Sequence, residues 1–189
     1  MIAIIACGSD KVEKISDIVS ELGYKNEILS IDDITPENNT FFDRYDAIII
    51  SGSPTTITRE NKQQYIERFS FIGNVKTPIL GICFGHQIIG HYFGCKYSIG
   101  AMMDGPNKID VVNRGEPLFQ NIRRKMFHEN HEEEISLPSS FRLLAYSNNC
   151  KNEAMKHIHK EIYGVQFHPE LSWVAGKRLI ENFLNVIKL

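Results

Sequence analysis

Short runs of entirely apolar residues constrain this chain more than any other feature. They cover Ile2–Ala6 and Ala47–Ile50, and a third, shorter run is centred on Ile79 and Leu80. Each run is about as long as a strand, and none contains a polar residue that would let one side face water. Such strands are typical of a parallel sheet covered by helices on both faces. The sequence therefore predicts a doubly wound α/β fold.

Amphipathic segments and turns separate these runs. Asp10 is expected to cap a helix whose apolar residues recur at helical spacing over residues 12–22. A further strand is predicted at about residues 27–31. Two more helices are predicted at about residues 59–72 and from residue 173 to residue 189. Strands and helices thus alternate in the first half of the chain, as a doubly wound fold requires.

The pattern changes after Gly94, where turn residues separate short pieces rich in β-branched and aromatic residues. These pieces predict a mixed or antiparallel extension of the sheet. They lie at residues 96–99, 108–112, 126–128, 132–135, 141–146, 153–158 and 161–167. No linker, repeat or low-complexity tract is visible in the 189 residues. Residues 1–189 are therefore expected to form a single domain.

Composition argues against several classes of function. The formal net charge is −2, so no basic excess points to a nucleic acid partner. The apolar runs are too short to span a membrane, and no basic leader precedes the first one. Four scattered cysteines show none of the paired spacings typical of zinc sites or disulfide frameworks. A cytoplasmic protein without a bound metal is expected.

Cys83 stands between Gly81 and Gly85, where the third apolar run ends and a helical pattern begins. A strand-to-helix turn flanked by glycines is typical of a nucleophile elbow. The N-terminus of the helix would favour the thiolate form of the cysteine. The alternative is an unreactive cysteine buried in a strand, which is the commoner fate of a free cysteine.

A histidine that would serve a thiol nucleophile stands in His168-Pro169-Glu170. Proline favours extended backbone, in which residues two apart point the same way. Glu170 can then orient the imidazole of His168 and leave its other nitrogen for Cys83. By itself this tripeptide would be a solvated loop, but together with the elbow it predicts a catalytic triad.

Three motifs in this order resemble those of a class I (triad) glutamine amidotransferase, and the resemblance spans nearly the whole chain. The motifs are Ser51 to Pro54, Gly81 to Gln87 and Gly164 to Glu170. The resemblance implies a flavodoxin-like fold and hydrolysis of glutamine to glutamate and ammonia through a γ-glutamyl thioester, with no cofactor.

The same resemblance assigns roles to residues of the site. It makes Cys83 the nucleophile, His168 the general base and Glu170 the partner that orients it. It also implies a set of oxyanion and substrate contacts, which are Gly52, Ser53, Phe84, Gln87, Asn130 and His131.

Ser53 departs from the family pattern, in which glycine usually precedes this proline. Glycine permits a peptide flip and unusual torsions, whereas serine before Pro54 is restricted. The departure predicts either an oxyanion hole that forms only when a partner binds, or a different substrate.

Residues 127–135 and 153–157 resemble the glutaminase subunit of two-subunit GMP synthase. That resemblance implies that the partner is an ATP-pyrophosphatase subunit, which converts XMP to GMP. Residues 171–176 instead have the spacing found in imidazole glycerol phosphate synthase, although that family usually has Met where His86 stands. A stand-alone γ-glutamyl hydrolase and an inactive amidotransferase-like module are further alternatives.

A glutaminase subunit must pass its ammonia to a second active site. The partner is therefore expected to dock over the Cys83 face, beside exposed apolar residues. No Walker-type lysine motif is present, so ATP binding is expected of the partner. The run Glu132-Glu133-Glu134 predicts a solvated turn, with a docking patch as the alternative. His86 is expected to be structural and not a second base.

Overall fold

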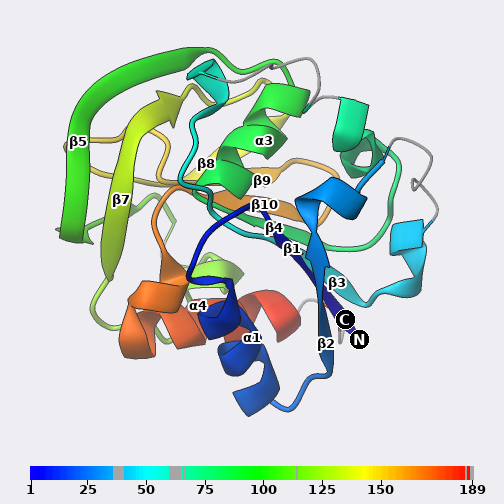
Figure 1. Ribbon diagram of the computed structural model, residues 1–189. Coiled ribbons are helices and arrows are strands. Elements are labelled where there is room, and N and C mark those ends of the chain that lie inside the picture. Colours follow the sequence, from blue (N-terminus) through cyan, green and yellow to red (C-terminus); the bar gives the residue numbers. More distant parts are fainter. Residues whose placement is uncertain (36–40, 60–64, 66, 114, 186, 188–189) are drawn as a thin grey trace.

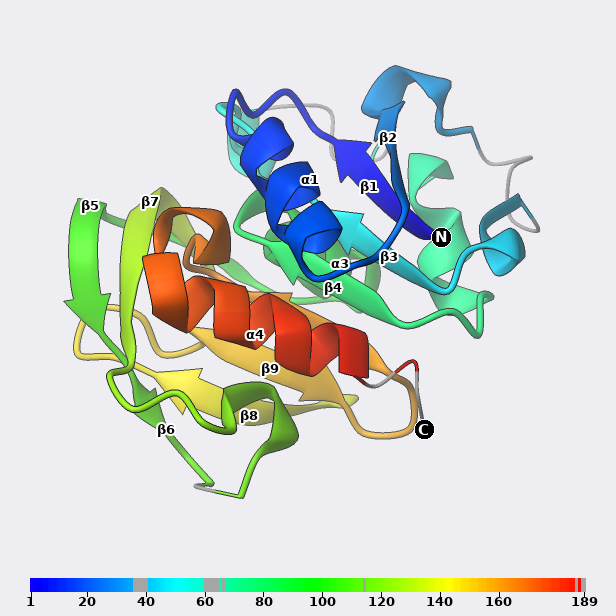
Figure 2. The same cartoon turned by 90° about the horizontal axis from the view of Figure 1, so that it is seen from below.

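The computed structural model describes residues 1–35, 41–59, 65, 67–113, 115–185 and 187. Its main sheet has eight strands: β1 (Ile2–Ala6), β2 (Asn26–Ser30), β3 (Ala47–Ile50), β4 (Ile79–Ile82), β6 (Asp110–Val111), β8 (Phe141–Tyr146), β9 (Ala154–His157) and β10 (Ile162–Val165). Their order is β2-β1-β3-β4-β10-β9-β8-β6 (Figures 1 and 2). Neighbours from β2 to β10 are parallel, and those from β10 to β6 are antiparallel. The prediction of a mostly parallel sheet with a mixed extension is confirmed.

Helices cover both faces of this sheet. The α-helices are α1 (Val12–Glu21), α3 (Phe84–Tyr92) and α4 (Trp173–Asn185). Short 3₁₀ helices are η1 (Ile31–Asp33), η3 (Ile57–Arg59), η4 (Ser70–Gly73), η5 (Pro117–Phe119) and η6 (Pro169–Leu171). Helices α1 and α4 lie side by side on one face, and α3 lies on the other (Figures 1 and 2).

Two apolar clusters fill the space between the sheet and these helices. Along β1, Ile2 and Ile4 belong to the cluster beneath α1 and α4, whereas Ala3 and Ile5 belong to the cluster beneath α3. Successive residues of a strand point to opposite faces, so a strand covered on both faces must be apolar throughout. This requirement explains the uninterrupted apolar runs.

A separate two-stranded sheet consists of β5 (Tyr97–Lys108) and β7 (Met126–Ile135). The strands are antiparallel, with an irregularity between Ile99 and Met103. An isolated bridge between His128 and His168 joins β7 to the chain that follows β10. For the segments that form β5 and β7, the sequence predicts shorter strands separated by turns, and that prediction is wrong. Pairing between β5 and β7 carries both strands through their glycines and charged residues.

The local predictions differ from the structure at helix ends. The N-cap of α1 is Lys11, whose N–H donates to the hydroxyl of Ser9, so the predicted cap at Asp10 is wrong. Residues 60–64 and 66 of the helix expected at 59–72 lie outside the described residues, and its ends form η3 and η4. None of the helices in the described ranges is long and apolar enough to cross a membrane.

Candidate active site

Cys83 occupies a sharp turn between β4 and α3. Its φ of 51° and ψ of −103° are unusual for a residue with a side chain. A Cβ atom on Gly81 would clash with the backbone of Gly85, and one on Gly85 would clash with the carbonyl oxygen of Ile50. The two glycines are therefore required by close packing of the turn against itself and against β3. This geometry is that of a nucleophile elbow.

His168 reaches the elbow because β10 is the parallel neighbour of β4. The backbone N–H of Cys83 donates to the carbonyl of Val165 at 2.8 Å, which fixes the two strand ends together. The backbone N–H of His168 donates to His128 in β7 at 2.8 Å. Backbone hydrogen bonds with β10 and β7 thus fix the positions of Cys83, at the end of β4, and His168.

Glu170 lies against the imidazole of His168, and its Oε1 is 2.7 Å from Nδ1. Both side chains are buried. His168 has extended backbone, as expected, but Pro169 begins the 3₁₀ helix η6. The carboxylate therefore arrives from the first turn of η6 and not from an extended strand. Its position against Nδ1 leaves Nε2 available to the thiol.

Electrostatics favour a proton on His168. Burial by itself would lower the pKa of His168, but hydrogen bonds with Cys83 and Glu170 and the charges of both groups raise it to about 11. The raised pKa keeps a proton on this imidazole at neutral pH. The pair is therefore suited to form a thiolate beside an imidazolium, which is the reactive state of a cysteine nucleophile.

A pocket of about 250 Å³ opens beside Cys83. Its size suits one small molecule. The pocket is lined by Ser53, Pro54, Thr55, Thr56, Cys83, Phe84, Gln87, Met102, Asn130, His131, Glu132 and Glu133. Five of the six predicted oxyanion and substrate contacts are in this set. The sixth, Gly52, lies deeper: a Cβ there would be 3.0 Å from Cε1 of His168 and 3.7 Å from Cβ of Cys83.

Ser53 takes its place in the loop after β3 without a left-handed backbone. The described non-glycine residues with positive φ are Cys83, Asn121 and Trp173, so Ser53 is not among them. Its hydroxyl lies 2.9 Å from that of Thr55 and accepts the Thr55 N–H at 3.2 Å. Ser53 therefore does not adopt a positive φ in this conformation, and its side chain stabilises the turn.

Gln166 belongs to the site although the sequence did not single it out. Its amide nitrogen lies 3.7 Å from the sulfur of Cys83, and its oxygen accepts from Gln87 at 3.3 Å. Gln87 also donates to the backbone carbonyl of Glu133 at 2.8 Å. The position of Gln166, two residues before His168 in an extended segment, was the signal that places both on one side of the strand.

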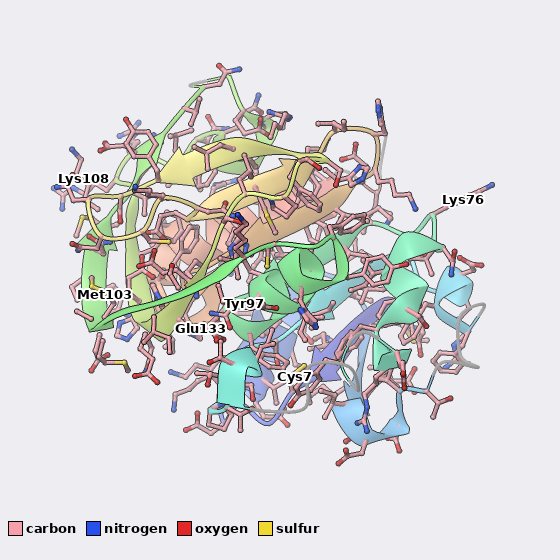
Figure 3. The ribbon with its side chains drawn as sticks, turned by 90° about the horizontal axis from the view of Figure 1, so that it is seen from above. Cys7, Lys76, Tyr97, Met103, Lys108 and Glu133 are labelled. Atoms are coloured by element: carbon pink, nitrogen blue, oxygen red, sulfur yellow. The ribbon has the colours of Figure 1, made fainter. Side chains whose placement is uncertain are left out.

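Glu133 is buried, so the expected solvated turn at residues 132–134 is wrong. Its carboxylate accepts the backbone N–H groups of Ile57 at 2.9 Å and Thr58 at 3.0 Å. Figure 3 labels Glu133 at the place where β7 approaches η3. The carboxylate therefore ties the loop that follows β3 to β7, and both of these segments line the pocket.

A second buried polar cluster lies beneath β7. Nε2 of His131 is 3.2 Å from Glu129, and Glu129 in turn contacts Glu153. Both glutamates are fully buried. Burial first, and then the charge of Glu129, raise the pKa of Glu153 to about 9. Two buried carboxyl groups in contact are best satisfied when one of them holds a proton.

His86 lies close to this cluster. It is fully buried, and burial together with nearby His131 lowers its pKa to about 3. A neutral, buried imidazole agrees with the structural role expected for His86. Among the described residues, no group of three or more histidine, cysteine or acidic side chains is arranged to hold a metal ion.

Replacing Glu153 with glutamine is expected to flatten the dependence of stability on pH. Between its ordinary pKa of 4.5 and about 9, Glu153 keeps a proton in the folded state that it loses on unfolding. The free energy of unfolding should then fall as pH rises, by up to about 1.4 kcal/mol per pH unit for one proton. Urea unfolding of wild type and E153Q from pH 5 to pH 9 measures the difference. If the free energies of unfolding of the two proteins changed equally with pH, that result would contradict a proton held by the Glu129–Glu153 pair.

Comparison with known proteins shows which protein family the chain resembles. The sequence pattern of the family "Glutamine amidotransferase class-I" matches residues 3–187. The A-type subunit of the glutamine-hydrolysing GMP synthase of Pyrococcus abyssi is 34% identical over 187 residues, which are 97% of this chain and 96% of the relative. The corresponding subunit from Pyrococcus furiosus is also 34% identical, over 98% of both chains.

A solved structure gives the same result. A protein of Thermoplasma acidophilum, provisionally assigned as the A-type subunit of a GMP synthase, superimposes with a TM-score of 0.87 and 28% sequence identity. The match covers 99% of this chain and 93% of the other. The whole fold is therefore shared.

Proposed function

The chain belongs to the class I glutamine amidotransferases, and from that premise we propose that it is the glutaminase subunit of a two-subunit GMP synthase. It hydrolyses L-glutamine to glutamate and ammonia, and a partner subunit uses the ammonia to convert XMP to GMP. The contact of Cys83, His168 and Glu170 at one edge of the sheet carries the glutaminase function. The names of relatives that cover nearly the whole chain support the choice of GMP synthase.

The three residues of the triad act in sequence. His168 takes the proton of the Cys83 thiol, and the thiolate attacks the side-chain amide carbon of glutamine. The imidazolium then protonates the departing ammonia, which leaves a γ-glutamyl thioester on Cys83. His168 next removes a proton from a water molecule that cleaves the thioester to glutamate. Glu170 holds the imidazole in orientation and stabilises its positive charge.

Backbone N–H groups stabilise the oxyanion of each tetrahedral intermediate. Phe84 begins α3, and the first N–H groups of a helix have no partner within it. Its N–H and that of the Gly52-Ser53 loop are the proposed donors, each contributing about 3 kcal/mol to the transition state. Binding of the partner subunit is proposed to bring the N–H donor of the Gly52-Ser53 loop into position for the oxyanion. Gln87, Asn130 and His131 are the proposed contacts to the glutamine, since they line the same pocket.

The partner is proposed to be an ATP-pyrophosphatase subunit that docks over the Cys83 face. Ammonia released there must reach the second active site before it takes up a proton, so the two sites need a shared, covered path. We assign ATP binding to the partner and no cofactor to this chain. The four cysteines form no disulfide, which is compatible with the reducing cytoplasm proposed as its compartment.

Glutamine-dependent conversion of XMP to GMP tests this function. The pure chain is mixed with the ATP-pyrophosphatase subunit encoded in the same genome, with ATP, Mg²⁺, XMP and glutamine, and GMP and glutamate are measured. One glutamate is expected per GMP. A GMP rate no higher than that without glutamine, from a partner that is active with added ammonia, would reject the assignment.

A further inference from the structure

Trp173 and Val174 are the most exposed large apolar side chains in the described part of the chain. Their exposed fractions are 89% and 83%, whereas the next, Ile99, reaches 66%. They are consecutive and begin α4. Leaving two such side chains in water forgoes the free energy of burying them. Adjacent exposed apolar residues of this size mark a surface that another molecule covers.

The backbone holds Trp173 in this exposed position. Its φ of +44° is rare for a bulky residue and is strained. The first turn of α4 is packed so tightly on η6 that a Cβ on Gly176 would clash with the carbonyl oxygen of Pro169. Strain of this kind persists only where the surrounding structure enforces it. Trp173 is therefore presented to the outside by the packing of α4 on η6.

A chain of short contacts connects this position to the triad. Ser172, directly before Trp173, donates its hydroxyl to the carbonyl of His168 at 2.6 Å. The same hydroxyl accepts the backbone N–H of His128 at 2.9 Å. Glu170 lies between these residues in η6. A molecule that presses on Trp173 would therefore act on the segment that positions the imidazole and its carboxylate.

The Trp173 surface is also continuous with the active-site pocket. A second hollow shares Ser53, Pro54 and Asn130 with that pocket and extends to His168 and Leu171. A third hollow shares Leu171 and extends to Trp173 and Val174. The first turn of α4 lies between α1 and β7 (Figure 2).

Positive charge surrounds the two apolar side chains. The hollows on either side of Val174 are lined by five cations, which are Lys14, Arg123, Arg124, Lys177 and Arg178. Lys177 is paired with Glu21 and Arg178 with Glu181, and the other acidic residue of these hollows, Glu170, is paired with His168. Among the described residues, no acidic group lies within ion-pair distance of Lys14, Arg123 or Arg124. The chain as a whole carries a net charge of −2, so this basic rim is a local feature.

We propose that Trp173 and Val174, within their basic rim, form the anchor on which the ammonia-using synthase subunit docks. This inference rests on the proposed function, which supplies the need for a partner at this edge. The rim specifies the partner's chemistry: an apolar pocket that receives the indole, bordered by Asp and Glu side chains. Docking at this point covers the path to Cys83 and restrains η6, and thus the carboxylate of Glu170.

Truncation of the anchor tests the proposal. Binding of the synthase subunit to wild type, W173A and W173F is measured by calorimetry, together with I158A as an exposed apolar control. Ile158 is 52% exposed and lies in the turn between β9 and β10, at the opposite edge of the sheet from Cys83. W173A should weaken binding by about 30-fold or more, as truncation of an aromatic hot spot does. W173F should retain most of the affinity, and I158A all of it.

Charge reversal and kinetics complete the test. R123E combined with R124E should weaken binding most at low salt. W173A should leave the glutaminase rate of the isolated chain unchanged. Its glutamine-dependent GMP synthesis should need more synthase subunit to reach the same maximum.

Wild-type affinity in both W173A and the double reversal, with GMP synthesis intact, would overturn the anchor and leave the proposed function standing. If wild type forms a homodimer that W173A loses, while binding of the synthase subunit is unchanged, the surface serves self-association. That result would also overturn the anchor. A wild-type chain that neither binds the synthase subunit nor supports GMP synthesis would overturn both proposals.

Discussion

Replacing Cys83 with alanine should lower glutamine-dependent GMP synthesis by a factor on the order of 10⁵ or more, the usual loss when a triad nucleophile is removed. Synthesis from added ammonia should continue at the wild-type rate. The thiol forms and breaks the bond to glutamine but has no part in using the ammonia. Both rates are measured on the assembled enzyme, with glutamine or an ammonium salt as nitrogen source.

Cys95 provides a matched control for this variant. It is a partly buried cysteine that forms no disulfide, and it lies three residues after the end of α3, outside the pocket. C95A should keep both rates, and a glutamine-like electrophile such as a diazo-ketone should label it as it labels wild type. An equal loss of both rates in C83A would mean that the substitution disturbs assembly, and would count against a purely nucleophilic role.

The second large effect is expected from His168→Asn. Without a base the thiol must ionise unaided, so the glutaminase rate at pH 7 should fall by a factor on the order of 10⁴. The pH profile should also change. Wild type keeps its imidazolium across neutral pH because the pKa of His168 is raised to about 11. Its rate should therefore vary little between pH 6.5 and 8.5.

The residual rate of H168N should instead rise about tenfold per pH unit, up to the ordinary pKa of a thiol near 8.5. Initial rates of glutamate release from pH 6 to pH 9 measure both profiles. H159N is the control, because His159 is an exposed histidine in the turn between β9 and β10. Identical profiles in H168N and wild type would remove His168 from the role of base.

The local geometry around Cys83 and around His168 could be predicted from sequence because each depends on a local rule. Glycines flank Cys83 because the turn admits no Cβ there, and such glycines can be read directly from the sequence. His168 and Glu170 are close in sequence, so their contact requires only a short segment of backbone. The meeting of the two motifs follows from parallel strands β4 and β10, whose carboxyl ends lie at one edge.

Strand β7 shows where this reasoning stops. Its buried side chains alternate as a strand requires, but three of them are ionisable: Glu129, His131 and Glu133. An ionisable residue in a sequence is normally taken as exposed. Glu133 is buried because the backbone N–H groups of Ile57 and Thr58 satisfy its carboxylate, and Glu129 contacts Glu153. These partners lie far away in the chain. The run of three glutamates therefore predicted a solvated turn at residues 132–134, where the structure has part of β7.

The triad residues also do not reveal which synthase the chain serves. The same three residues serve every member of the family, so they carry no information about the final acceptor of ammonia. Only segments outside the triad, such as residues 127–135 and 153–157, favoured GMP synthase. The extent of the domain, residues 1–189, stays a prediction. The roles of individual site residues also stay predictions, and the variants above test those of Cys83 and His168.

The position of β10 determines when the enzyme becomes active during its own synthesis. This strand inserts between β4 and β9, although residues 79–82 of β4 leave the ribosome about eighty residues earlier than residues 162–165. Until then the elbow has no base beside it, and β4 presents an open edge. Glutamine hydrolysis is thus confined to nearly finished chains, and a nascent chain carries a dormant thiol.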